Sequence, residues 1–141
     1  MTEFKKEFLN MVTKNELRKI AKEKLKDAEV LYSKGRYDCS VYICGYAVEI
    51  MLKARICRTL KWNGYPSTRA EFQNYQSFKT HNLEVLLRLS GLETMIKNQY
   101  MSAWSDIIRW DPEIRYKSAG TAGHNDALAM IEAVKTLMRR L

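Results

Sequence analysis

The chain has 141 residues and a mass of 16.5 kDa, which is the size of one domain. Hydrophobic residues make up 46% and charged residues 28% of it, which excludes a wholly disordered chain, and six glycines and two prolines are too few for a collagen-like or turn-rich β protein. The net charge is +8, most of it in residues 1–70. This excess either marks an anionic partner, such as nucleic acid, nucleotide or an acidic protein surface, or is only a solvated basic surface.

The cysteine spacing and the lack of a recognisable targeting segment predict an intracellular protein. Cys39, Cys44 and Cys57 are odd in number and form no C-x-x-C pair, so we expect small, half-buried thiols in a reducing cytoplasm rather than disulfides or a zinc site. Residues 1–10 lack the apolar core of a signal peptide, and the apolar stretch 41–48 is too short to span a membrane. We expect a cytoplasmic location and no metal or cofactor.

The first two predicted elements are helices with clear ends. Thr13 and Glu16 have the spacing of a capping box, and Gly35 is a natural stop for the helix that they open. Asp38 is the expected cap of a second helix that runs to about Lys61. Apolar residues recur at steps of three and four along both helices.

Gly45 lies inside the second helix and weakens it by about 1 kcal/mol relative to alanine. A residue that weakens its own helix indicates that another backbone packs closely against it. That close contact would suit either the core of the bundle or the seam of a dimer.

The rest of the chain alternates turns and helices. Residues 62–79 begin with turn chemistry and contain an irregular loop, after which Thr80 is expected to cap a short helix over 81–89 that stops at Gly91. A fourth helix is expected over 93–110.

The fourth helix ends at Asp111-Pro112, because the residue before proline avoids the α region. A loop of small residues, 118–123, then leads into a last helix that reaches Leu141. The short connections predict an all-α, up-and-down antiparallel bundle of four or five helices, a single domain over 1–141 with its core at about 15–140.

Two polar features could be structural or functional. Glu49 and Lys53 are four residues apart on the second helix and form either a structural ion pair or the polar floor of a binding cleft. His81 either hydrogen-bonds a neighbouring segment or contacts a ligand.

Candidate anion-binding residues gather before the last helix. Trp110 either packs at a helix end or stacks on a base, and Arg115, Tyr116 and Lys117 precede a helix N-terminus that attracts anions. The alternative is a flexible entry loop. A P-loop signature and the common metal-binding motifs are absent from the sequence.

Four runs together resemble the HEPN domain family. They are Gly35-Arg36-Tyr37-Asp38, then Tyr42-x-x-Gly45-Tyr46-Ala47-Val48-Glu49-x-x-Leu52-Lys53-Ala54, then Thr80-His81-Asn82-Leu83-x-x-Leu86-Leu87, then Arg115-Tyr116. The resemblance implies a helical bundle that usually dimerises and a link to nucleotides or RNA. It also implies a partner nucleotidyltransferase in a toxin–antitoxin or defence-type pair.

Ribonuclease members of that family carry an Arg, four to six residues, then a His. Here eight residues, 116–123, separate Arg115 from His124, so the motif is absent in its usual spacing. If the two side chains converge across the loop, the resemblance implies that Arg115 stabilises phosphate charge and His124 acts as acid or base.

These observations predict a HEPN-like, homodimeric binding module rather than an enzyme. Its site would recognise nucleotide, RNA or a partner nucleotidyltransferase, and its predicted members are Glu49, Lys53, His81, Arg115, Tyr116 and Lys117. The first alternative is a metal-independent RNA endonuclease toxin that uses Arg115 and His124. The second alternative is a pure protein-assembly partner.

Overall fold

The long helices α2 (Lys14–Ser33) and α3 (Tyr37–Leu60) form an antiparallel hairpin in the computed structural model, which describes residues 11–141. Thr13 caps α2 as predicted, since its hydroxyl accepts a hydrogen bond of 3.2 Å from the Glu16 amide. The chain reverses at Gly35, whose φ of 72° is readily adopted only by glycine. The prediction about a signal peptide concerns residues 1–10 and lies outside the described part.

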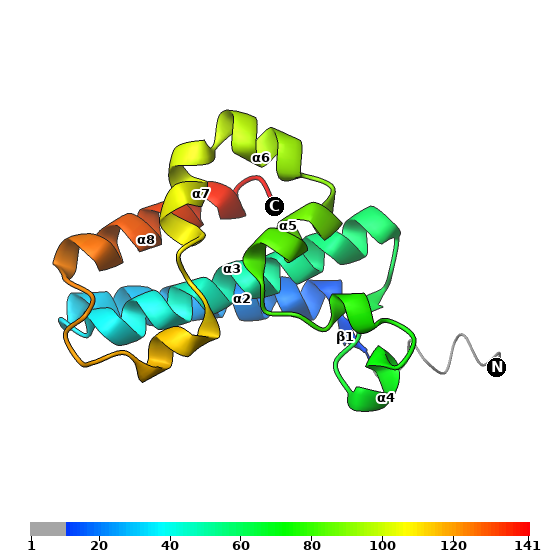
Figure 1. The fold of residues 1–141 in the computed structure, drawn as a ribbon, viewed down its shortest axis with the longest axis horizontal. Coiled ribbons are helices and arrows are strands. Elements are labelled where there is room, and N and C mark those ends of the chain that lie inside the picture. The colour runs from blue at the N-terminus through cyan, green and yellow to red at the C-terminus, as the bar shows by residue number, and fades with distance from the viewer. Residues whose placement is uncertain (1–10) are drawn as a thin grey trace.

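The remaining helices complete the predicted up-and-down bundle. The short helices α5 (Leu83–Ser90), α6 (Glu93–Gln99) and α7 (Met101–Ile107) together return the chain toward the start of α3, and α8 (His124–Met138) then runs beside α3 (Figure 1). The all-α prediction is confirmed. One of the four legs of the bundle is built from three short helices.

The core lies between α3 and the helices packed on it. Apart from Tyr65 in the loop after α3, its largest fully buried side chains come from α3 and the legs that follow it: Val48, Met51, Leu52, Ile56, Leu86, Leu87, Ile96, Trp104, Ile107, Val134 and Leu137. α3 is the central helix, because it packs against α2, α5 and α8. It therefore has little of its surface left for solvent, and polar residues along it need partners.

The prediction of one helix over 93–110 is wrong, because the helix breaks at Tyr100. Residues 93–110 contain no glycine or proline that would predict a break in the helix. The break is tertiary in origin: it lets Lys97 in α6 and Trp104 in α7 reach the same carboxylate, that of Glu84 in α5. The first cap of this leg also differs from the prediction, since Asn82 rather than Thr80 caps α5.

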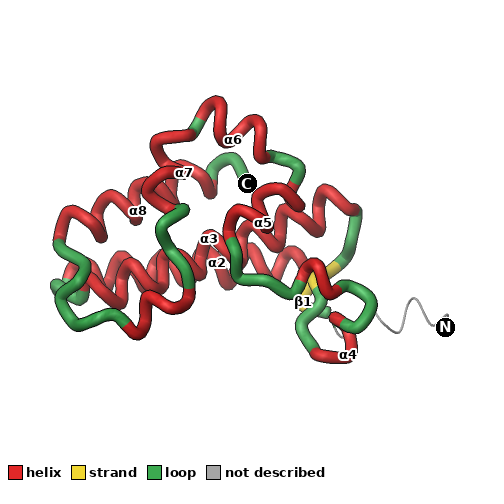
Figure 2. The backbone as a smooth tube through the Cα atoms, viewed as in Figure 1, coloured by secondary structure: helices red, strands yellow, loops and turns green. Residues whose placement is uncertain are grey.

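The loop 62–79 is more structured than predicted. It contains β2 (Gly64–Tyr65), which pairs antiparallel with β1 (Val12–Thr13), and the short helices α4 (Arg69–Phe72) and η1 (Gln76–Phe78) (Figure 2). An aromatic cluster holds it together: Trp62, Tyr65, Tyr75 and Phe78 pack edge to face or tilted. This segment is thus a small apolar unit at one end of α3.

The cysteines are free thiols and differ in exposure. Cys44 and Cys57 are buried, whereas Cys39 is exposed, so the expectation of half-buried thiols fails at all three. Burial raises the pKa of Cys44 to about 12 and that of Cys57 to about 11. Between residues 11 and 141, none of the helices is both long and apolar enough to cross a bilayer.

Candidate functional site

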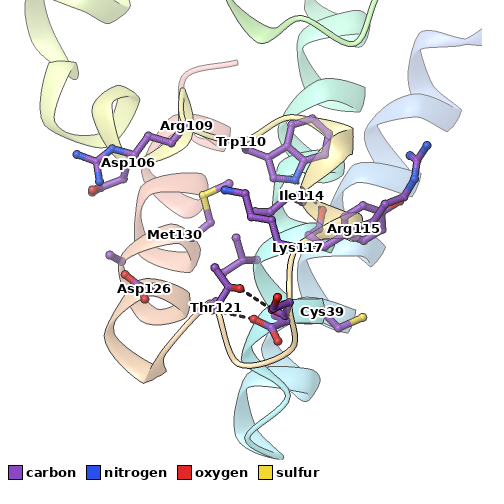
Figure 3. Close-up of a pocket in the computed structure, with 16 residues that line it drawn as sticks. Cys39, Asp106, Arg109, Trp110, Ile114, Arg115, Lys117, Thr121, Asp126 and Met130 are labelled. Carbon is purple, nitrogen blue, oxygen red and sulfur yellow. Dashed lines mark hydrogen bonds between the residues drawn. The ribbon is translucent and has the colours of Figure 1, made fainter.

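A pocket of about 590 Å³ opens between the first turns of α3, the segment that follows α7, and the first half of α8 (Figure 3). That segment includes the 3-10 helix η2 (Pro112–Tyr116). The volume is in the range of small-molecule sites. The lining is the following set: Asp38, Cys39, Val41, Tyr42, Asp106, Arg109, Trp110, Ile114, Arg115, Lys117, Ser118, Thr121, Ala122, Asp126, Ala129 and Met130.

The indole of Trp110 forms the inner wall of the pocket. It is 4% exposed, packs into the space left by the missing side chain of Gly45, and donates a hydrogen bond of 3.1 Å from Nε1 to the carbonyl of Tyr42. A close contact at Gly45 was predicted, but its partner is a side chain, not a backbone. Because this partner belongs to the same chain, the close contact at Gly45 lies within the bundle.

Asp38 holds the loop on the opposite side of the pocket. Its carboxylate accepts hydrogen bonds from the backbone N–H groups of Ala122 at 2.7 Å and Gly120 at 2.6 Å. The bond from Ala122, followed by that from Gly120, keeps the pKa of Asp38 below its usual value. The predicted role of Asp38 as the cap of α3 is therefore wrong: the N-cap is Arg36, without a side-chain hydrogen bond.

The pocket contains three basic and three acidic side chains. Two of the acidic side chains accept hydrogen bonds from backbone N–H groups: Asp38 from Gly120 and Ala122, and Asp126 from Gly123. In contrast, the ion pairs found within residues 11–141 include none of the three basic residues of the pocket, Arg109, Arg115 and Lys117. The pocket therefore offers cations without fixed carboxylate partners.

The basic residues approach the pocket from two sides. Figure 3 shows Arg115 on the side of the pocket opposite Asp106 and Arg109, with Lys117 between them. The guanidinium of Arg115 lies 4.7 Å from the centre of the exposed Tyr116 ring, and Tyr116 and then Tyr42 hold the pKa of Arg115 above its usual value. Arg115 therefore stays cationic at any physiological pH.

The predicted residues Glu49, Lys53 and His81 form a second group outside this pocket. Glu49 is buried and pairs with Lys53 Nζ at 3.2 Å and with His81 Nδ1 at 2.8 Å. Lys53 also lies 5.4 Å from the centre of the Tyr65 ring. The predicted Glu49–Lys53 pair and the predicted hydrogen bond of His81 to a neighbouring helix are both present.

The two groups share one face of α3. Tyr42, Tyr46, Glu49 and Lys53 follow each other at steps of four, three and four residues, so they line one stripe. Tyr42 and Glu49 are two turns apart, about 10 Å along the axis. The single cleft that the sequence predicted is therefore two adjacent groups, with the Tyr46 ring between them packed on Trp110.

The two predicted catalytic residues have different neighbours. Arg115 contacts Tyr116 and Tyr42, whereas His124 lies at the start of α8 and shares a hydrogen bond of 2.6 Å with the Tyr32 hydroxyl through Nε2. The ring of His124 also packs against Tyr37. Within the described residues no hydrogen bond joins Arg115 to His124.

Sequence reasoning missed several residues of the pocket. Arg109, Asp106 and Met130 were not singled out, and Cys39 was considered only for disulfides and metal. One signal was available: Asp38, Val41 and Tyr42 have the spacing of a single helix face, which placed them together. Nothing local indicates that this face meets α8.

A comparison with protein families bears on this geometry. Residues 15–70 match the family model of the HEPN domain. This segment is therefore HEPN-like, as its sequence motifs indicated. The matched segment covers most of α2, all of α3, β2 and the start of α4, so it contains only the α3 wall of the pocket. None of the curated proteins and none of the solved structures compared with this chain gives a match.

Proposed function

We propose that this HEPN-type module binds a nucleotide or the end of an RNA strand in the pocket between α3, η2 and α8. The observation that carries the proposal is the presence, in one pocket, of cations without an ion-pair partner among the described residues and of an apolar wall. Lys117 and Arg115 supply positive charge for a phosphate, and Val41, Ile114 and Met130 supply apolar surface for a base or sugar. The net charge of +8 would assist the approach of an anionic ligand.

The predicted group Glu49–Lys53–His81 would extend this site along α3. His81 is the exposed member, with 61% of its side chain accessible, whereas Glu49 is inaccessible to a ligand. We therefore expect His81 and Lys53 to contact a ligand longer than a mononucleotide, with Glu49 as their fixed partner. Tyr116, which is 72% exposed on the rim, would contact such a ligand from the other end.

The proposal is tested by thermal shift with ATP, GTP, their monophosphates and a short single-stranded RNA, at low and high salt. A ligand at 100 times its dissociation constant stabilises by about 2.7 kcal/mol, which raises Tm by several degrees for a chain of this size. Lys117→Gln and Arg115→Gln should abolish most of that shift, whereas Lys22→Gln on the exposed face of α2 should leave it unchanged. A shift that vanishes at high salt in all four proteins alike would contradict a specific pocket.

The family resemblance also suggests what the module works with. We propose a homodimer that associates with a nucleotidyltransferase in a toxin–antitoxin or defence-type pair. Sedimentation analysis of the purified chain tests the dimer. Co-expression with a nucleotidyltransferase encoded beside it tests the pair, and separate elution of the two proteins would contradict it.

The ribonuclease alternative makes a distinct prediction. If Arg115 and His124 act together, the protein cleaves single-stranded RNA in the presence of EDTA and His124→Ala abolishes the cleavage. Binding without cleavage, unchanged by His124→Ala, supports the binding module. Absence of any nucleotide or RNA signal favours the pure assembly partner instead.

A further inference from the structure

A cluster of arginines lies at the end of the bundle remote from the pocket. We call it the arginine cluster, and its members are Arg18 in α2, Arg55 and Arg58 in α3, and Arg140 after α8. Arg18 contacts Met51, one turn before Arg55, and donates to Leu141, the residue after Arg140. Arg55 lies about 20 Å further along α3 than Tyr42 of the pocket. In Figure 1 α8 runs away from the first turns of α3, and the chain after it reaches α2 at Arg18.

The guanidinium groups of this cluster contact a main-chain oxygen and sulfur atoms rather than acidic side chains. Arg18 donates to the main-chain oxygen of Leu141 at 3.0 Å and contacts Met51 Sδ at 4.0 Å, and Arg140 contacts Met95 Sδ at 3.8 Å. None of the ion pairs found within residues 11–141 includes a member of the cluster. Four cations are therefore gathered without an acidic side chain from the described part of the chain.

Arg55 has a buried hydrogen-bond donor, its Nε, for which the described residues provide no acceptor. Burial, and then the charges of Arg58, Arg18 and Arg140, lower the pKa of Arg55. A buried donor without an acceptor and a set of mutually repelling cations are both unfavourable, and one bound oxyanion would relieve both.

We propose that the arginine cluster is an anion site for a phosphate group, separate from the pocket. A phosphate presents several acceptor oxygens to several guanidinium groups at once, and the planar fork of arginine suits it better than a lysine ammonium does. The group can belong to a small phosphate compound or to the backbone of a nucleic acid, since the chemistry is the same. The proposal does not rest on the function assigned to the pocket.

The test uses two probes, sodium pyrophosphate by calorimetry and a short single-stranded RNA by fluorescence anisotropy. Arg58 and Arg140 are exposed, so the double variant R58Q/R140Q should keep the fold. The expected result is about tenfold weaker binding of at least one probe by this variant. Arg69→Gln, an exposed arginine on α4, controls for the loss of a positive charge and should change the affinity by less than about twofold per charge removed.

A second variant tests whether the guanidinium group itself is needed, and not only its positive charge. Arg55→Lys keeps the positive charge but removes the buried Nε, and circular dichroism verifies that it is folded. We expect it to weaken binding as R58Q/R140Q does. If RNA is the ligand and pyrophosphate is not, the slope of log K against log salt should also become shallower by about 0.7 for each phosphate that a variant no longer neutralises.

The proposal is overturned if the wild-type protein binds neither probe, or if R58Q/R140Q binds both probes as the wild type does. It is also overturned if Arg69→Gln weakens binding as much as the cluster variants, because the attraction is then non-specific. Lys117→Gln separates the two sites: binding that is lost in Lys117→Gln but kept in R58Q/R140Q assigns the anion to the pocket alone.

Discussion

The indole of Trp110 occupies the space that a side chain at Gly45 would need. A Cβ atom at position 45 would overlap the ring atoms Cε2, Cδ2 and Nε1. The ring is held from the other side by its hydrogen bond to the Tyr42 carbonyl and by the edge of Tyr46. One glycine in the middle of a long helix thus positions the inner wall of the pocket.

Gly45→Ala should therefore destabilise the protein. Alanine favours a helix by about 1 kcal/mol, but displacing a buried, hydrogen-bonded indole costs more, and we expect the free energy of unfolding in urea to fall by ~1–3 kcal/mol. Gly123→Ala is the control, because a Cβ there meets only Asp126 Oδ2 at an ordinary 3.6 Å. A Gly45→Ala protein as stable as the wild type would show that the indole has room to move.

This pair also illustrates how far the sequence predicts the fold. The period of apolar residues, the Thr13 cap and the glycine stop at Gly35 predicted the α2–α3 hairpin, because each depends on residues a few positions apart. The spacing predicted a tight contact at Gly45 for the same reason. It could not identify Trp110, which lies far along the chain and meets Gly45 only after the third leg has packed.

The candidate site shows the same division. The Glu49–Lys53 pair follows from a spacing of four, but the contacts of Asp38 with Gly120 and of Glu49 with His81 join distant segments. The break at Tyr100 has no local signal at all. Arg115 and Lys117 were found through their local chemistry, whereas the acids and apolar residues that face them depend on how α8 meets α3.

Asp38→Asn should loosen the loop 118–123. Gly120 and Ala122 donate to different oxygens of the carboxylate, and in asparagine one of these oxygens is replaced by an NH2 group that cannot accept, so one of the two bonds is lost in this geometry. We expect faster hydrogen exchange at the amides of Gly120 and Ala122 in this variant. Asp27→Asn on the exposed face of α2 is the control. Equal protection of both amides in Asp38→Asn and the wild type would contradict a role for the carboxylate.

Glu84 makes stability depend on pH on the acid side. Its carboxylate accepts from Trp104 Nε1 at 2.9 Å and from Lys97 Nζ at 3.0 Å, and these bonds, that of Trp104 foremost, lower its pKa in the folded state. A lowered pKa means that the stabilisation is present above the unfolded value of about 4.3 and is lost as the pH falls through the folded value.

Glu84→Gln should therefore flatten the acid limb of the stability profile, measured by urea unfolding followed by tryptophan fluorescence between pH 6 and about pH 3. At pH 6 the variant should be less stable than the wild type, and the two curves should converge toward low pH. Glu23→Gln, which removes an exposed partner of Lys26, should leave the profile unchanged. Parallel curves for Glu84→Gln and the wild type would exclude this carboxylate as a source of the pH dependence.

Glu49 and His81 contact each other but should respond differently to substitution. The Glu49 side chain is 4% exposed and pairs with both Lys53 and His81, so Glu49→Ala leaves the lysine without its partner in a largely buried position. We expect the free energy of unfolding to fall by ~2–4 kcal/mol. His81, which is 61% exposed, should lose less than ~1 kcal/mol in His81→Ala. Urea unfolding of both variants tests this difference. Equal losses of unfolding free energy would mean that His81, and not the buried ion pair of Glu49 with Lys53, anchors the start of α5 to α3.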